Sequence, residues 1–361
     1  MSLSCGLVGL PNAGKSTLFS ALTGTDTLVA SYPFSTLEPK RGVVPVPDPS
    51  LDTLARVLRP AKVTPATFEV VDLAGLVAGA SRGEGLGNEF LSHIRSVDAL
   101  LHVVRCFRAG QVPHVAGEPA PRRDTEVVTT ELLLADLELV ERRLDRLRKA
   151  ARQDPKTARV ELAVLERCRE ALARGQGIRA LELDDGARRL LKGWGLLSAK
   201  AICYVANTDR SDPGGLALVQ ELVAAATGAP VVEVDGKLEG ELAFLPPEEQ
   251  AAFVTELGLA EPALHRLVRA TYRLLGLVTF YTVVGTELRA WSLPDGGTAL
   301  DAAAQIHTDL ARGFVRAEVV SVEEFVTTPS LAQLREGGVV RLEGREYRVR
   351  NGDILTIRFA T

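Results

Sequence analysis

The stretch GLPNAGKST, residues 9–17, decides the fold, because it has the spacing Gly9, four residues, then Gly14, Lys15 and Ser16. The apolar run LSCGLV precedes it and the helix-like TLFSALTG follows it. In a strand, glycine loop and helix of this kind, backbone N–H groups and the positive end of the helix surround phosphate oxygens. The lysine reaches the β- and γ-phosphates, and the serine hydroxyl ligates Mg²⁺. The pattern predicts a nucleoside triphosphate site with Mg²⁺ rather than a turn that only joins a strand to a helix.

Length and composition set the limits for the rest of the chain. With 361 residues, two or three modules are expected, and a net charge of −4 argues against a generally basic nucleic-acid-binding surface while leaving local patches open. The four cysteines are far apart without ligand spacing, which predicts buried, reduced thiols. There is no signal-peptide pattern before the first apolar run, and no run approaches the roughly 20 residues that cross a bilayer. We therefore expect a cytoplasmic protein without a membrane partner.

Apolar strands alternate with helical patterns in the first part of the chain. The expected strands, in addition to the one before Gly9, are ATFEVVDLAG (66–75), ALLHVVRCF (99–107), KAICYVAN (200–207) and APVVEVDG (229–236). This alternation predicts an α/β fold, a P-loop nucleotidase with a doubly wound, mostly parallel sheet. Its ligand is expected at the carboxyl ends of the strands.

Two other segments have patterns of their own. Residues 124–198 contain two amphipathic helical patterns rich in Arg and Glu, which predict an inserted α-helical hairpin. Its charged face is either solvated or a contact for RNA or protein. Residues 277–361 predict a small α+β module with short strands at LVTFYTV, ELRAWSL, FVRAEVV, VVRLEG and EYRVR. Residues 1–123 and 199–276 then form a discontinuous nucleotide-binding domain.

Two further residues are candidates for the phosphate end of the site. Asp72 ends an apolar strand in the pattern Asp72-Leu73-Ala74-Gly75, where the carboxylate holds Mg²⁺ through water and the Gly75 N–H senses the γ-phosphate. Thr36, in SYPFST, lies where a switch loop supplies a second hydroxyl to the metal. An acid at a strand end or a threonine in a loop is common by itself, so both assignments depend on the upstream glycine loop.

The chain departs from switch GTPases at two positions. Leu76 follows Gly75 where many of these proteins have a glutamine that orients the attacking water. The guanine-reading motif Asn-Lys-x-Asp is replaced by Asn207-Thr208-Asp209-Arg210, so the lysine and the final carboxylate are missing. We therefore expect adenine rather than guanine, and a water positioned by another group.

At this point several segments resemble the Obg-like ATPases of the YchF subfamily. They are GLPNAGKST, YPFSTLEP, DLAGLVAGASRGEGLGNEFLSHIR and HVVRCF, and LRAWSL with QIHTDLARGFVRAEVVS resembles the TGS domain that ends these proteins. The likeness covers nearly the whole chain, and the glycine-rich run after Asp72 is its most specific part. The resemblance implies a P-loop GTPase fold that prefers ATP, a C-terminal TGS domain at 277–361 and association with ribosomes.

The resemblance also assigns residues. It implies that nucleotide is bound by Asn12, Ala13, Gly14, Lys15, Ser16, Thr17, Gly75, Phe107, Asn207 and Thr208, and that the metal is held by Ser16, Thr36 and, through water, Asp72. It implies a catalytic histidine on a mobile loop, which matches His114 in PHVAG. From the residues alone, His114 is as readily a solvent-exposed loop histidine.

Two positions depart from the family pattern, and a third raises the question of a second cation. Arg210 stands where the family has a glutamate, which puts the strength of the adenine preference in doubt, and Ser35 replaces a cysteine. Asn12 is either a turn residue or a ligand for K⁺ beside the phosphates.

The sequence thus predicts an ATP-binding, ATP-hydrolysing switch protein with slow intrinsic turnover that binds GTP less specifically. Its expected partners are ATP and ADP, ribosomes or ribosomal subunits, and RNA through the hairpin and the TGS domain. Two alternatives stay open. One is a nucleotide-gated ribosome- or RNA-binding module whose hydrolysis is incidental, and the other is a GTP-preferring switch GTPase.

Overall fold

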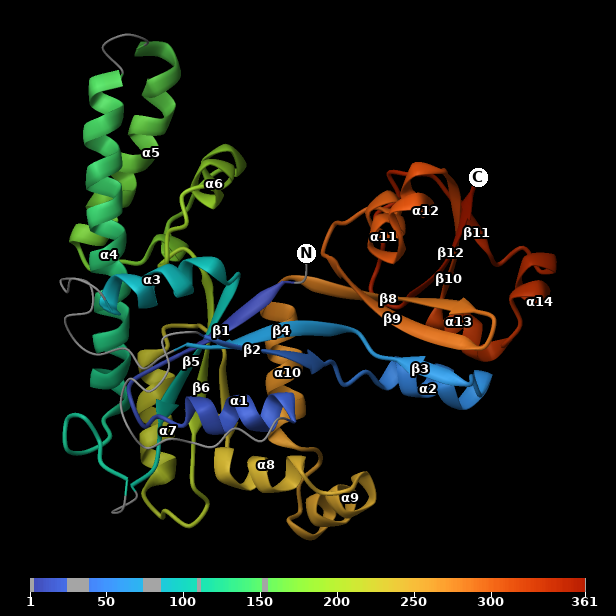
Figure 1. Ribbon diagram of the computed structural model, residues 1–361, viewed down its shortest axis with the longest axis horizontal. Coiled ribbons are helices and arrows are strands. Elements are labelled where there is room, and N and C mark those ends of the chain that lie inside the picture. Colours follow the sequence, from blue (N-terminus) through green and yellow to red (C-terminus); the bar gives the residue numbers. More distant parts are fainter. Residues whose placement is uncertain (1–2, 25–38, 74–85, 109–111, 151–154, 361) are drawn as a thin grey trace. The chain divides into compact units, whose positions relative to one another are not determined.

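The computed structural model describes residues 3–24, 39–73, 86–108, 112–150 and 155–360 (Figure 1). The chain forms two compact units, one from residues 3–42 and 70–267 and the other from residues 43–69 and 268–361. Each unit is built around its own six-stranded sheet. The predictions for Ser35, Thr36, Gly75 and Leu76 lie outside the described residues.

The first sheet has the strand order β2-β4-β1-β5-β6-β7. Its strands are β1 (Ser4–Val8), β2 (Lys40–Pro45), β4 (Thr67–Asp72), β5 (Ala99–Arg105), β6 (Ala201–Asn207) and β7 (Val231–Val234). The pairs β1–β5, β5–β6 and β6–β7 are parallel, with Leu7 opposite Leu101 and Arg105 opposite Asn207. The four strands predicted after Gly9 are confirmed, and so is the mostly parallel sheet.

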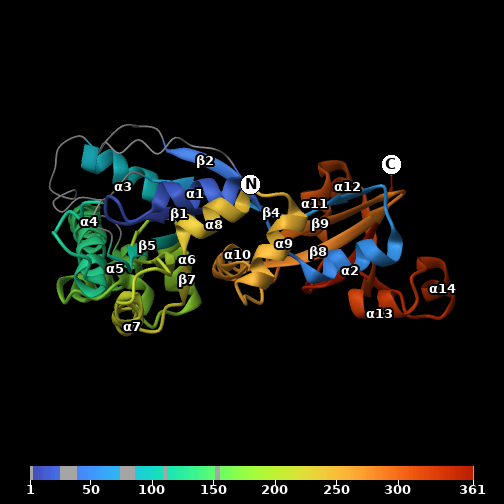
Figure 2. The same ribbon diagram turned by 90° about the horizontal axis from the view of Figure 1, so that it is seen from below.

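Apolar side chains cover both faces of this sheet. On one face, residues of β1, β5 and β6 pack with α3 (Leu86–Ser96), α4 (Pro121–Ala150) and α7 (Gly215–Ala225). Successive strand residues point to opposite faces, so Leu7, Leu101 and Cys203 are buried on the other face. The helices α1 (Lys15–Thr23) and α8 (Gly236–Ala243) contact each other and lie side by side in Figure 2. The remaining helices here are α9 (Pro247–Glu256) and α10 (Ala263–Leu274), which runs into the second unit.

The two helices predicted within 124–198 are present as α4 and α5 (Pro155–Ala173), which lie against each other (Figure 1). Their shared core also takes in η1 (Ile178–Ala180) and α6 (Asp185–Lys192). The first helix begins at Pro121, before the expected boundary, because its first half packs on the sheet through Val128 and Leu132. The buried Asp136 accepts hydrogen bonds from the Leu197 and Ser198 N–H groups at 2.8 and 2.7 Å, which ties the returning chain to α4.

The second unit has a mixed sheet of order β11-β10-β12-β8-β9-β3. Its strands are β3 (Lys62–Thr64), β8 (Leu277–Val284), β9 (Glu287–Pro294), β10 (Phe314–Ser321), β11 (Arg341–Glu343) and β12 (Asp353–Phe359). The helices are α2 (Pro49–Leu58), α11 (Ala299–Ile306), α12 (Thr308–Arg312), α13 (Val322–Thr327) and α14 (Leu331–Glu336). One face packs against α11 through Phe280, Leu293 and Ala303.

Two expectations for this region differ from the structure. Residues 43–69 were assigned to the nucleotide-binding domain, but β3 pairs in parallel with β9 and Asp48 accepts a 2.6 Å hydrogen bond from the Tyr281 hydroxyl. They therefore group with the C-terminal residues. The segment EYRVR is no strand; only Arg348 forms an isolated bridge, to Thr298, and the strand that completes the sheet is β12.

Within the described residues, none of the helices has the length and apolar character needed to cross a membrane. The cysteines Cys5, Cys106, Cys168 and Cys203 are all free and buried, as the sequence predicted.

Candidate nucleotide site

The loop between β1 and α1 depends on glycine at two points. Gly9 has φ +151°, and a Cβ there would lie 2.3 Å from the Val103 carbonyl oxygen. Gly14, just before α1, has φ +97°, and its Cβ would lie 2.1 Å from Asn207 Nδ2. Both positions combine a backbone that L side chains rarely adopt with a neighbour that leaves no room. The two glycines of the motif are therefore required by the path of the loop.

Lys15, the first residue of α1, is almost completely buried. Its Nζ donates to the carbonyl oxygens of Gly9 and Leu10, at 3.1 and 2.9 Å. Burial lowers the pKa of Lys15 to about 8, and the nearby Asp72 carboxylate acts in the opposite direction. The loop thus holds a single cation at its centre, where phosphate oxygens could replace the carbonyl partners.

Ser16 and Asp72, the two predicted metal ligands that the structure describes, lie next to each other. The Ser16 hydroxyl donates to Asp72 Oδ2 at 2.8 Å, which joins the first turn of α1 to the end of β4. Burial raises the pKa of Asp72, and the Ser16 hydrogen bond and the charges of Lys15 and Lys40 partly offset this. A hydroxyl and a carboxylate oxygen are the hard ligands that Mg²⁺ prefers. The pair therefore fits a magnesium ion beside the phosphate loop.

Asn207, which was expected to lie at the nucleotide base, holds the phosphate loop in place. At the end of β6 its Nδ2 donates to the Ala13 carbonyl at 2.8 Å, and its Oδ1 accepts from the Gly236 N–H at 3.1 Å. The amide is buried with both polar atoms engaged. Asn207 thus connects the phosphate loop with the start of α8, and its side chain has a structural task that the sequence did not reveal.

The other base-site candidates lie on the loops after β5 and β6. Phe107 is half-buried, with the Arg105 guanidinium 4.7 Å from its ring centre. Thr208 donates its backbone N–H to the Val234 carbonyl at 2.9 Å, and Arg210 donates its own to Asp235 Oδ2 at 3.1 Å. Asp209 accepts from Ser211 at 2.6 Å. The strand ends therefore bring Phe107, Asn207 and Thr208 to the same edge of the sheet as the phosphate loop.

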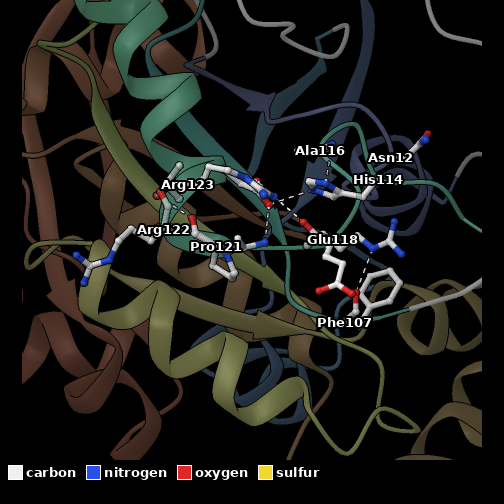
Figure 3. A network of polar contacts seen from close by, with 12 residues as sticks. Asn12, Phe107, His114, Ala116, Glu118, Pro121, Arg122 and Arg123 are labelled. Atoms are coloured by element: carbon white, nitrogen blue, oxygen red, sulfur yellow. Dashed lines mark hydrogen bonds and ion pairs between the residues drawn. The ribbon is translucent and has the colours of Figure 1, made fainter.

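His114 differs from the expectation of an exposed loop histidine. Its side chain is only 3% exposed, and its Nε2 lies 3.1 Å from Oδ2 of Asp124 in the first turn of α4. Its Nδ1 accepts the Ala116 N–H at 3.1 Å. Figure 3 shows the ring between Arg123 on one side and Asn12 on the other. The loop is exposed at Pro113 and Val115, but the imidazole is packed against the helical hairpin.

Asn12 connects this loop to the phosphate loop. It has φ +61°, a conformation that asparagine tolerates better than most residues, and its Nδ2 donates to the Pro113 carbonyl at 3.1 Å. Ala13 is buried, and Thr17 is half-buried on α1. The predicted phosphate-site residues that the structure describes are thus contiguous, and His114 lies next to them through Pro113.

Sequence reasoning missed Asp124 as a functional candidate. An acidic residue in the first turn of a helix is an ordinary feature that stabilises the helix end. Its partner lies ten positions earlier, outside any helical or strand periodicity, so no local pattern could indicate the pairing.

Comparison with known proteins agrees with this geometry. Residues 4–135 match the family described as "50S ribosome-binding GTPase", and residues 277–360 match the C-terminal YchF GTPase family described as "Protein of unknown function (DUF933)". The "Ribosome-binding ATPase YchF" of Pasteurella multocida is 46% identical over 99% of this chain and 99% of its own. The protein of the same name from Bacillus subtilis is 45% identical over 99% of this chain and 100% of its own.

A solved structure extends the likeness to three dimensions. The YchF GTPase of Schizosaccharomyces pombe is 32% identical, with a TM-score of 0.86 over 99% of this chain and 98% of that one. A GTP-binding protein from Pyrococcus horikoshii, at 21% identity and a TM-score of 0.62, shares the fold. With relatives above 30% identity over nearly its whole length, the chain belongs to the YchF family of P-loop nucleotidases.

Proposed function

We propose that this protein binds and hydrolyses ATP and uses the nucleotide state to control its association with ribosomes. The observation that carries the proposal is the contact between Ser16 and Asp72 beside the buried Lys15, which sets a metal-binding pair next to a phosphate-binding cation. The whole-length relatives named as ribosome-binding ATPases supply the partner and the nucleotide. A ribosome-associated protein would work in the cytoplasm.

Different groups at the phosphate end of the site would bind the phosphates and the metal. Backbone N–H groups of residues 12–17 and the ammonium of Lys15 would hold the β- and γ-phosphates. Ser16 and Asp72, with Thr36, would hold Mg²⁺, which would supply positive charge to the β- and γ-phosphate oxygens on which negative charge develops during transfer. Gly75 would sense the γ-phosphate through its N–H. K⁺ near Asn12 is a further candidate cation, and replacing K⁺ with Na⁺ in the hydrolysis assay tests it.

Adenine is the better fit for the base end. Guanine is recognised through its N1 and N2 hydrogens, which need a carboxylate, and Arg210 occupies that position. The amide of Asn207 is engaged by Ala13 and Gly236, so the base would be held mainly by packing near Phe107 and by groups around Thr208. GTP would bind in the same phosphate loop without specific recognition of its base.

Hydrolysis requires a residue other than Leu76 to orient the attacking water, because the leucine side chain has no polar atom. We propose His114 for this task, because its loop contacts the phosphate loop through the hydrogen bond from Asn12 to Pro113. The second candidate function is a nucleotide-gated ribosome-binding module in which occupancy carries the signal and hydrolysis is incidental. The packed position of His114, favourable to slow turnover, is the observation that supports this alternative.

The nucleotide preference can be tested by calorimetry. ATP is expected to bind at least as tightly as GTP, and Lys15→Ala is expected to weaken both, because the phosphate contacts do not depend on the base. Asp209→Asn is a control on the loop after β6, because the Asp209 carboxylate accepts hydrogen bonds from the N–H and the hydroxyl of Ser211. A preference for GTP of about tenfold, or about 1.4 kcal/mol, would instead identify a GTP-preferring switch GTPase.

A further inference from the structure

Both ring nitrogens of His114 are engaged by the protein. Nδ1 accepts the Ala116 N–H, so the ring proton of the neutral imidazole is on Nε2. Nε2 lies 3.1 Å from Asp124 Oδ2, to which it therefore donates. Their side chains are 3% and 5% exposed. In this arrangement the imidazole has no free nitrogen with which to contact a water molecule.

Asp124 is itself fixed from several sides. Its Oδ2 accepts the Ala120 N–H at 3.2 Å, and its Oδ1 accepts from Arg123 Nε and a guanidinium NH₂ at 3.1 and 2.9 Å. The same Arg123 nitrogen donates to the Glu118 carbonyl at 2.5 Å. The carboxylate is thus a fixed acceptor in the first turn of α4, the long helix of the hairpin.

The opposite side of the His114 loop is attached to the nucleotide site. The Pro113 carbonyl accepts from Asn12 in the phosphate loop, and the Val112 carbonyl accepts from an Arg105 guanidinium NH₂ at 3.0 Å. Residues 112–116 therefore connect the phosphate loop with the start of α4. Asp124 lies at one end of this connection and Asn12 lies at the other.

We infer that Asp124 is a positioning residue that holds His114 in a resting position and so limits ATP hydrolysis until the His114–Asp124 contact opens. The inference rests on the proposed function, in which His114 orients the attacking water. A general base or water-orienting group must be within hydrogen-bond reach of the water through a free ring nitrogen. The resting arrangement uses both nitrogens, so at least one contact must break first. Because Asp124 belongs to α4, a shift in the first turn of this helix changes the hold on His114.

The test compares ATP turnover of four proteins at saturating ATP: wild type, Asp124→Asn, His114→Ala and the double variant. Asparagine keeps the shape of aspartate but lacks its charge, so the hold on His114 weakens. We expect Asp124→Asn to raise turnover by about threefold or more, as the competent population increases. His114→Ala is expected to slow turnover, and Asp124→Asn is expected to change nothing further in that background, because Asp124 acts only through His114.

Asp136→Asn is the matched control. This buried aspartate is on the same helix and accepts from Leu197 and Ser198 without contacting His114. Its variant is expected to leave turnover unchanged. A readout independent of activity is the ring N–H of His114 in ¹⁵N NMR, assigned by its loss in His114→Ala. In wild type the proton should be on Nε2 and exchange slowly with water, and Asp124→Asn, but not Asp136→Asn, should speed this exchange.

Several results would overturn the inference. If Asp124→Asn lowers or does not change turnover while His114→Ala slows it, the hold is wrong and the proposed function stands. If Asp124→Asn has the same effect in both backgrounds, or if Asp136→Asn has the same effect as Asp124→Asn, the substitutions act on α4 in general. Fast exchange of the wild-type ring N–H would mean that the contact does not hold His114 in solution. If His114→Ala leaves turnover unchanged, the proposed catalytic histidine and this inference fail together.

Discussion

Gly14, Lys15 and Asn207 show how single residues fix the phosphate loop. The missing Cβ of Gly14 leaves space for the Asn207 amide, which in turn holds the Ala13 carbonyl. Lys15 fills the centre of the loop and is held by the carbonyls of Gly9 and Leu10. The phosphate loop is therefore held in shape by contacts within the protein, and such a preorganised loop lowers the ordering cost of binding.

The pKa of Lys15 predicts the pH dependence of ATP affinity. Burial lowers this pKa to about 8 in the nucleotide-free protein, whereas bound phosphates would favour the charged ammonium and raise it. Above pH 8 the free protein loses a proton that the complex keeps, so affinity falls as pH rises, by up to about tenfold per pH unit. Calorimetric titrations between about pH 7 and about pH 9 measure this fall. Lys15→Arg, which stays charged throughout, should show a flatter profile; equal profiles would contradict the assignment.

His102 predicts a loss of stability in acid. It is buried in β5, where its Nδ1 has no hydrogen-bond partner among the described residues, and burial, with the charges of Lys15 and Arg179, lowers its pKa to about 3. Below its ordinary value of 6.5 the unfolded chain binds a proton that the folded chain does not. This lowers the free energy of unfolding by about 2 kcal/mol at about pH 5.

Urea unfolding of the first unit tests this prediction. A Trp291→Phe background leaves Trp194, in the first unit, as the fluorescent reporter. His102→Leu should reduce the loss of stability between neutral and mildly acid pH. His307→Gln, at an exposed histidine, should leave this loss the same as in the Trp291→Phe background protein. The same loss in both variants would show that other groups cause the acid sensitivity.

At the scale of elements, the sequence predicted what is local and missed what is distant. The strands β1, β4, β5, β6 and β7 and the helices α4 and α5 follow from their apolar patterns, and the Ser16–Asp72 contact follows from the motif and its strand end. The pairing of β3 with β9 joins residues more than 200 positions apart through three-residue and eight-residue strands, and no pattern in 62–64 marks it. Apolar and polar residues alternate in EYRVR as they do in a strand, but the segment forms one isolated bridge only. Alternation alone therefore does not predict a strand where no neighbouring strand pairs with the segment.

The dependence of α2 and β3 on the C-terminal strands predicts the result of a deletion. Without residues 277–361, β3 loses its pairing with β9 and Asp48 loses the Tyr281 hydroxyl. The elements α2 and β3 should then unfold locally, so trypsin should cut after Arg56 and Lys62 much faster than in the intact chain. Mass spectrometry of timed digests measures the rates, with Arg188 and Arg189 on α6 as reference sites. Unchanged rates at Arg56 and Lys62 would mean that α2 and β3 are stable without their C-terminal partners.

At the scale of the whole molecule, a nucleotide site and a separate sheet-based unit occur in one chain. The helical hairpin has its own apolar core, yet it begins on the sheet and meets the His114 loop through Asp124. This places a structural connection between the hairpin and the site of phosphate chemistry within one unit. A partner that engages the hairpin could therefore affect hydrolysis without touching the nucleotide.

The measurement that tests the central claim most directly is steady-state ATP hydrolysis with and without purified ribosomes, for the wild type and for Lys15→Ala. We predict slow hydrolysis by the wild type alone, faster hydrolysis with ribosomes, and no protein-dependent hydrolysis by Lys15→Ala in either case. A ribosome-dependent increase that is absent from Lys15→Ala would place both the chemistry and its control in this phosphate loop. Hydrolysis by the wild type that never exceeds that of Lys15→Ala, with or without ribosomes, would contradict the account.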